Sequence, residues 1–252
     1  MKYSSLISIN LSVNNPEVSY MLGIMGMPNI DLDRLMNEPI YALDFQFMIG
    51  DVQDYLDFSE NNIECQYRTE LQSIKRHAEA GDFEGFPHDY REYLEANAEH
   101  RFKVSFPLKI RYGALLALTT AVEWSVVYLV QGLKMPIDKV PKGKNKTIHA
   151  LEFINKHLGL RYGALIKDFE ALVWLRNCIA HCAGIERDYE YRDKLPEAIS
   201  RLKGFSLAKW HFLGSHVAIE RSALDKYIEE MKHLVVNLYK AAHEQSFLTL
   251  DT

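Results

Sequence analysis

A nearly unbroken apolar stretch constrains the fold of this chain more than any other feature. It runs from Tyr112 to Val130 and is about long enough to span a bilayer. Glu123 lies near its middle, and a carboxylate at the centre of a membrane is strongly disfavoured. We therefore expect a helix buried inside a helical bundle, and no association with a membrane.

The composition is that of a folded soluble protein. Of the 252 residues, 48% are hydrophobic and 25% are charged. The net charge of −5 excludes a basic protein that coats nucleic acid through its overall charge, so any RNA binding must rely on a local basic patch. Three cysteines (Cys65, Cys178 and Cys182) provide no disulfide framework, and the N-terminus lacks the pattern of a signal peptide. We expect a cytoplasmic protein.

Apolar residues recur with helical spacing along most of the chain, which predicts a mainly α-helical fold. Helices are expected over residues 31–80 (in several pieces), 88–101, 107–132, 147–158, 164–182, 195–202 and 222–244. Pro107 is expected to open the long apolar helix, and Gly184 to follow the end of the helix over 164–182.

Two segments depart from the helical pattern. Gly214-Ser215 separates two apolar runs between residues 205 and 219, which favours a small β-hairpin before the last helix. A strand or hairpin is also expected within residues 1–30. We interpret residues 1–103 as a mostly helical N-terminal extension and residues 104–252 as a helical bundle.

Polar residues interrupt the apolar helix that ends near Gly184. Arg176, Asn177 and His181 lie where packing alone would place apolar side chains, and buried charge is costly unless it is paired. Asn177 and His181 are one helical turn apart, and Arg176 is five positions before the histidine, roughly 140° around the axis. A phosphate could meet an imidazole acting as acid or base and a guanidinium that stabilises negative charge.

A structural alternative exists for the same residues. Arg176 would pair with Glu123, and His181 would be a core or helix-capping residue. A lone carboxylate in an apolar helix needs a partner, and Arg176 is the obvious one. We therefore expect the side chains of Glu123 and Arg176 to approach each other, whether Glu123 supports the site or only holds the arginine.

The sequence Arg176-Asn177-Cys178-Ile179-Ala180-His181 matches the Arg-x(4–6)-His motif, and in its helical setting residues 104–245 resemble the HEPN superfamily of helical ribonuclease domains. This resemblance implies metal-independent cleavage of RNA without a cofactor. The ribose 2′-hydroxyl attacks the neighbouring phosphate, leaving a 2′,3′-cyclic phosphate and a 5′-hydroxyl. By motif position His181 carries the acid/base role, Arg176 stabilises the pentavalent phosphate, and Asn177 orients the phosphate or the histidine.

The resemblance also bears on partners. One motif per chain implies a homodimer with a composite site, and a toxin or defence nuclease with an antitoxin or other regulatory protein fits the family. Ala183 stands where the toxin branch often has a tyrosine two residues after the histidine, which argues against an antitoxin that modifies that tyrosine. The family also contains non-catalytic members. The alternative is therefore a HEPN-like module for dimerisation or for binding a nucleotide or protein.

Two further residue groups are weaker candidates. Cys178, His181 and Cys182 suggest zinc, but three or four tetrahedral ligands are needed and the spacing does not provide them, so we expect no metal site and regard the cysteines as small core residues. A lysine-rich loop could guide an RNA backbone, although a solvated loop is the simpler interpretation. Its lysines are Lys134, Lys139, Lys142, Lys144 and Lys146, of which the last three are the candidate RNA contacts.

Overall fold

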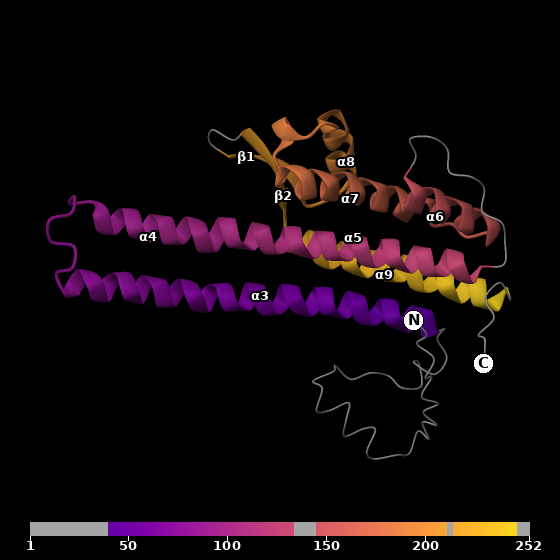
Figure 1. The fold of residues 1–252 in the computed structure, drawn as a ribbon, viewed down its shortest axis with the longest axis horizontal. Helices are drawn as coiled ribbons and strands as arrows, with labels where there is room; N and C mark the ends of the chain where they lie inside the picture. Colours follow the sequence, from indigo (N-terminus) through magenta and orange to yellow (C-terminus); the bar gives the residue numbers. More distant parts are fainter. Residues whose placement is uncertain (1–39, 134–144, 211–213, 246–252) are drawn as a thin grey trace, which may run out of the picture. The chain divides into compact units, whose positions relative to one another are not determined.

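The computed structural model describes residues 40–133, 145–210 and 214–245 (Figure 1). These residues belong to one compact unit that begins at Pro39. The strand or hairpin expected within residues 1–30 lies outside the described residues.

The described chain is mainly helical, with one two-stranded antiparallel hairpin before the last helix, as the sequence predicts. The helices are α3 (Ile40–Glu79), α4 (Tyr90–His100), α5 (Phe106–Gly132), α6 (Lys146–His157), α7 (Gly163–Cys182), α8 (Leu195–Arg201) and α9 (Arg221–Glu244). Short 3-10 turns lie at η2 (Glu186–Asp188) and η3 (Arg192–Lys194), and the strands are β1 (Phe205–Trp210) and β2 (Gly214–Ile219).

Helices α4 and α5 are not separate, because a π-helical turn, η1 (Arg101–Ser105), joins them into one rod (Figure 1). Pro107 lies in the first turn of α5, as expected, but the rod does not begin there. Its ring has no N–H and would clash with the carbonyl of Lys103, four residues earlier, in a regular α-helix. The wider turn immediately before Pro107 lets the rod continue.

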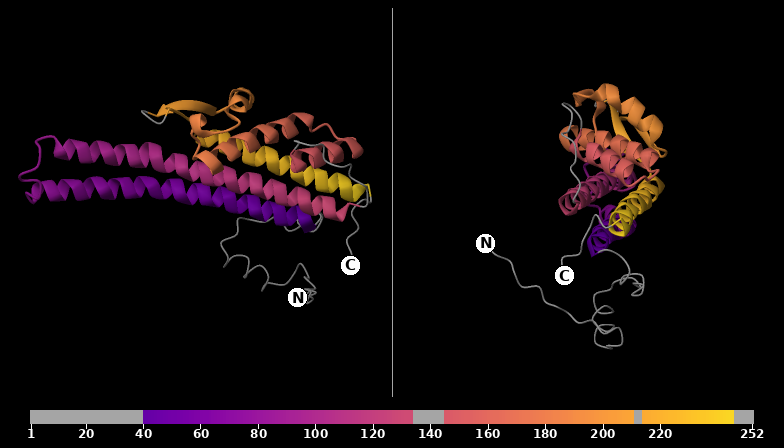
Figure 2. Two further views of the ribbon diagram at one scale, coloured as in Figure 1. Left: turned by 45° about the horizontal axis from the view of Figure 1, so that its top comes forward. Right: turned by 90° about the vertical axis from the view of Figure 1, so that its right-hand side faces the viewer.

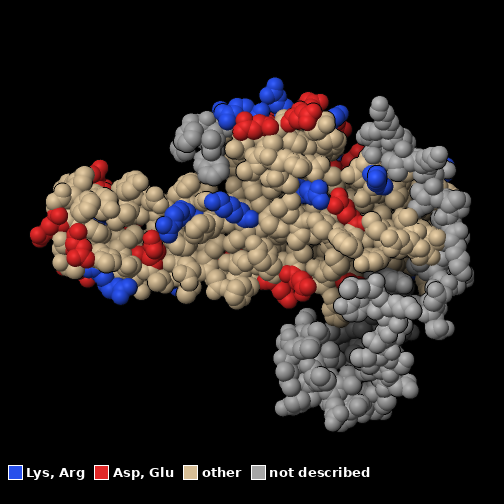
Figure 3. All heavy atoms as spheres, in the orientation of Figure 1, with Lys and Arg blue, Asp and Glu red and all other residues tan. Residues whose placement is uncertain are grey.

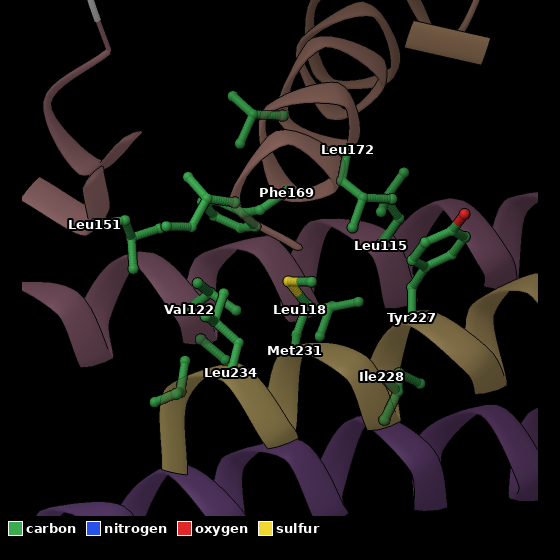
Figure 4. Packing of buried hydrophobic residues seen from close by; sticks show 14 of the residues in the cluster. Leu115, Leu118, Val122, Leu151, Phe169, Leu172, Tyr227, Ile228, Met231 and Leu234 are labelled. Atoms are coloured by element: carbon green, nitrogen blue, oxygen red, sulfur yellow. The ribbon is translucent and has the colours of Figure 1, made fainter. Parts of the chain in front are cut away.

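Helix α5 lies at the centre of the bundle and packs against α3, α7 and α9 (Figure 2). Leu118 and Val122 of α5 are fully buried between Phe169 of α7 and Met231 and Leu234 of α9 (Figure 4). Within the described residues the rod Tyr90–Gly132 holds the one window apolar and long enough to cross a membrane, and 50% of that window is buried inside the protein. Packing against neighbouring helices thus accounts for about half of this apolar stretch.

Helix α3 contributes to the same core. Phe45, Ile49, Val52 and Leu56 are buried in one cluster with α5, α7 and α9. The boundary expected between residues 103 and 104 thus falls inside the rod, and the compact unit begins at Pro39 instead. The rest of α3 runs alongside α4 as a two-helix arm (Figure 1), where a smaller cluster of Ile74, Ala98 and Phe102 is buried.

The hairpin is anchored to the end of α7. Its strands pair from Phe205↔Ile219 to Trp210↔Gly214. The Val217 N–H donates to the carbonyl of Gly184 at 2.9 Å, and the Val217 carbonyl accepts a hydrogen bond from the hydroxyl of Tyr112 on α5. The hairpin therefore ties the segment that follows α7 to the central helix.

Candidate active site at the end of α7

Arg176 of α7 forms an ion pair with Glu123 of α5. Its Nη2 donates to Glu123 Oε2 at 2.9 Å, and each side chain keeps 25% of its surface exposed. This confirms the expected approach of the two side chains. The pair lies at the edge of the core, where water still reaches both partners.

Asn177 continues this contact along the helix. Arg176 Nη1 donates to Asn177 Oδ1 at 3.0 Å, and the Asn177 amide is hydrogen-bonded to the hydroxyl of Tyr189. Tyr189 is buried, and burial raises its pKa to about 12, so this hydroxyl stays neutral. The side chains of Glu123, Arg176, Asn177 and Tyr189 are thus linked in one hydrogen-bonded series. The series runs from α5 through α7 to the segment that follows α7. Tyr189 was not identifiable from the sequence, because nothing in the local pattern separates it from Tyr191.

His181 is exposed, so the alternative that places this imidazole in the core is wrong. Leu175, Cys178 and Ile179 keep facing the core at the end of α7, whereas Ala180 and His181 face solvent. Among the described residues the imidazole makes no hydrogen bond and no ion pair. A core role for His181 is therefore excluded, and this residue is exposed one turn after Asn177.

The end of α7 is fixed by backbone geometry. Ala183 has a left-handed conformation (φ 52°), as does Gly184 (φ 81°), and the Gly184 N–H donates to the Cys178 carbonyl at 3.2 Å. A side chain at position 184 would collide with the Tyr112 hydroxyl. Gly184 therefore ends the helix as predicted, and its close approach to Tyr112 holds the turn that carries His181.

An exposed apolar patch on α5, made of Trp124, Val127 and Tyr128, follows Glu123 along the helix. Their exposed fractions are 51%, 46% and 47%, and the two aromatic rings lie 5.6 Å apart. Contiguous apolar surface of this kind is typical of interaction sites. The patch begins one residue after the partner of Arg176.

The cysteines do not gather around His181. Cys178 is buried, and burial raises the pKa of its thiol to about 12, while the Cys182 thiol lies 3.1 Å from the Asp188 carbonyl oxygen. Cys65 is exposed on α3. Over residues 40–133, 145–210 and 214–245, no group of three or more His, Cys, Asp or Glu side chains is placed to hold a metal ion.

The lysine loop is only partly described. Lys134, Lys139, Lys142 and Lys144 lie outside the described residues, and Lys146 is the exposed first residue of α6. The RNA-binding role of Lys142, Lys144 and Lys146 stays a prediction.

Comparison with known proteins found no matching family model, no matching curated protein and no matching solved structure. The chemistry of the candidate site must therefore be inferred from its own side chains. They offer an oriented guanidinium, an amide and an exposed imidazole within the last two turns of one helix.

Proposed function

We propose that this chain is a metal-independent endoribonuclease of the HEPN type, of the toxin or defence kind, that acts as a homodimer. One observation carries the proposal: Arg176, Asn177 and His181 all reach solvent on the last two turns of α7, and Glu123 holds the arginine in place. A buried histidine would have argued against it.

The chemistry needs only these side chains. The ribose 2′-oxygen forms a bond to phosphorus while the bond from phosphorus to the 5′-oxygen breaks. An imidazole accepts the proton of the 2′-hydroxyl, and an imidazolium donates a proton to the leaving 5′-oxygen. One imidazole cannot be neutral and protonated at once, so two His181 side chains, one from each copy, suit the reaction.

Arg176 is suited to stabilise the pentavalent phosphate. A guanidinium carries five N–H donors, of which Glu123 and Asn177 engage one each. The remaining donors can meet phosphate oxygens, and the two existing contacts fix the plane of the group in advance. Asn177 thereby orients the arginine, one turn from His181.

The exposed apolar patch supports the dimer. A second copy that covered Trp124, Val127 and Tyr128 would remove apolar surface from water and bring its own α7 beside Arg176. The same patch also favours the alternative, a non-catalytic HEPN-like module, because Arg176 already has an internal partner and dimerisation alone would bury the patch.

The deciding experiment is incubation of a random-sequence single-stranded RNA pool with the wild type and with His181→Ala, in the presence of EDTA. We expect wild-type cleavage to leave 2′,3′-cyclic phosphate ends and the variant to be about 100-fold slower or worse. His243→Ala, which changes another exposed histidine on α9, is the matched control and should cleave as the wild type does. Equal cleavage by the wild type and His181→Ala, or no cleavage by either, would overturn the catalytic assignment.

A further inference from the structure

A groove of about 550 Å³ lies between the start of α5 and the β-hairpin, apart from Arg176 and Glu123. The π-turn η1 forms one wall through Lys103, Val104 and Ser105, and β2 forms another through His216 and Ala218. This volume is that of a site for a small molecule or a single nucleotide. π-turns inside helices often mark functional sites, because they cost stability without improving packing.

The ionisable residues of this groove are all basic. Its described lining includes His100, Lys103, Arg111, Lys209 and His216, and no Asp or Glu. On the face drawn in Figure 3, Lys and Arg side chains gather along the rod beneath the hairpin. In a chain with a net charge of −5, a cavity whose ionisable lining residues are all basic is suited to an anion.

The three cations differ in how firmly they are held. Arg111 is fixed in the wall, because its Nε donates to Glu60 at 2.8 Å and its Nη1 to the Ile219 carbonyl at 3.0 Å. Lys103 forms an exposed pair with Glu99 at 2.8 Å, which water screens and a stronger anion can replace. Lys209 is exposed on β1 and carries the charge most accessible to a ligand.

The other half of the lining is apolar, including Val104, Leu108 and Ala218. Inorganic phosphate would leave most of the groove empty, and an acyl chain would meet charged groups along half of the wall. A nucleotide matches both halves, because its phosphate suits the cations and its base or ribose suits the apolar wall.

The groove connects directly to the end of α7. His216, in its floor, pairs through its backbone with Ile185, and the next residue, Val217, bonds to Gly184. The floor of the groove is therefore joined through the backbone to the segment that follows α7, although no residue of that segment lines the groove.

We propose that this groove binds a nucleotide, with the phosphate at Lys209 and the base or ribose against the apolar wall. The nucleotide is either free or a unit of a single-stranded RNA. Assigning RNA as the ligand would rest on the proposed function, whereas assigning a nucleotide to the groove does not.

The test measures binding of a fluorescent 2′-O-methyl oligoribonucleotide by anisotropy, and of ATP by calorimetry. The 2′-O-methyl group removes the attacking hydroxyl, so binding is separated from cleavage. Lys209→Glu should weaken binding about tenfold or more and lower the slope of log K against log salt by about 0.7 for each phosphate that the variant no longer neutralises. Lys203→Glu, which changes an exposed lysine before the same hairpin but outside the groove, is the matched control and should change affinity less than about twofold.

A second variant tests the shape of the groove. Ala208→Phe fills it without changing charge, so it should weaken binding and leave the salt slope unchanged. Binding of ATP but not of the oligonucleotide, with the same dependence on Lys209, would support the groove and identify a free nucleotide as its ligand. Equal weakening by Lys203→Glu and Lys209→Glu, or no binding of either probe, would overturn the proposal. Binding at Lys209 by a protein that cleaves no RNA would overturn the proposed function and leave the groove standing.

Discussion

Arg176 Nη2 lies 2.9 Å from Glu123 Oε2, and this contact joins the two most apolar helices of the bundle. Each helix carries one charge where its neighbours are apolar, and the two charges compensate each other. The pair explains why both residues are tolerated at the edge of the core. Together with the contact to Asn177, it fixes the orientation of the guanidinium.

A double-mutant cycle should detect this pair. Glu123→Gln and Arg176→Met should each destabilise the protein, and the double variant should lose less than the sum of the two. We expect a coupling energy of about 1 kcal/mol, since both side chains are partly exposed and water weakens their attraction. Urea unfolding of the four proteins measures it, and additivity within about 0.3 kcal/mol would show that the pair contributes nothing to stability.

Gly184→Ala should destabilise the protein more than Gly159→Ala. Both glycines have positive φ angles, 81° and 66°, so each alanine meets backbone strain of about 1 kcal/mol or more. At Gly184 the new methyl group also collides with the Tyr112 hydroxyl, whereas nothing lies within 4 Å at Gly159. We expect the thermal unfolding midpoint to fall further for Gly184→Ala than for Gly159→Ala. Equal decreases would refute the close packing of Tyr112 against the turn.

The stability of the fold should depend on pH through His216. Burial lowers its pKa below the usual 6.5, so the folded state binds the proton more weakly than the unfolded chain. The stability that the neutral imidazole contributes is therefore complete above pH 6.5 and is lost as the pH falls from 6.5 toward the lowered pKa.

Replacement of this histidine should flatten the acid side of the profile. Thermal midpoints between pH 7.5 and pH 5 should fall less steeply for His216→Gln than for the wild type. His243→Gln changes an exposed histidine and should follow the wild type. The same groove is lined by three cations, Lys103, Arg111 and Lys209, and by a second histidine, His100. His100→Gln is therefore measured as well, to distinguish the contribution of His100 from that of His216. Parallel profiles for wild type and His216→Gln would contradict the assignment.

Trp124→Glu should disrupt the proposed homodimer. A carboxylate in the centre of an apolar interface would be desolvated without a partner, which costs several kcal/mol of association energy. Size-exclusion chromatography with light scattering should show a dimeric wild type and a monomeric variant. Phe58→Glu is the control, because Phe58 is 74% exposed on α3 and lies outside the patch. A monomeric wild type, or a Trp124→Glu variant that stays dimeric, would exclude this patch as the interface.

Much of the secondary structure was predictable from local patterns. The spacing of apolar residues predicted bounds for α7 and α9 that are close to the observed ones, and Gly214-Ser215 indicated the hairpin. The Glu123–Arg176 contact was predictable as well, because two isolated charges in apolar helices have few other ways to be compensated. These features follow from the requirements of single segments, so the sequence contains them directly.

Other features depend on contacts between distant segments. Helical periodicity says which side of α7 is apolar, but not where that helix leaves the core, and so the exposure of His181 was not predictable. The partner of Asn177 was hidden for the same reason, since Tyr189 reaches it only after the chain turns at Ala183 and Gly184. The basic groove was not predictable either, because Arg111 of α5 and Lys209 of β1 line one cavity only after the chain has folded.

The amino-acid sequence alone therefore determined the extents of α6, α7, α8 and α9, the hairpin, the central apolar helix and the pairing of its single carboxylate, because each follows from local patterning or from the cost of an isolated charge. Only the tertiary structure decided that residues 40–103 belong to the bundle, that His181 is exposed, and that a basic groove lies between the start of α5 and the hairpin. Burial and cavities are properties of packed surfaces, and packing is set by neighbours that lie far apart in the chain.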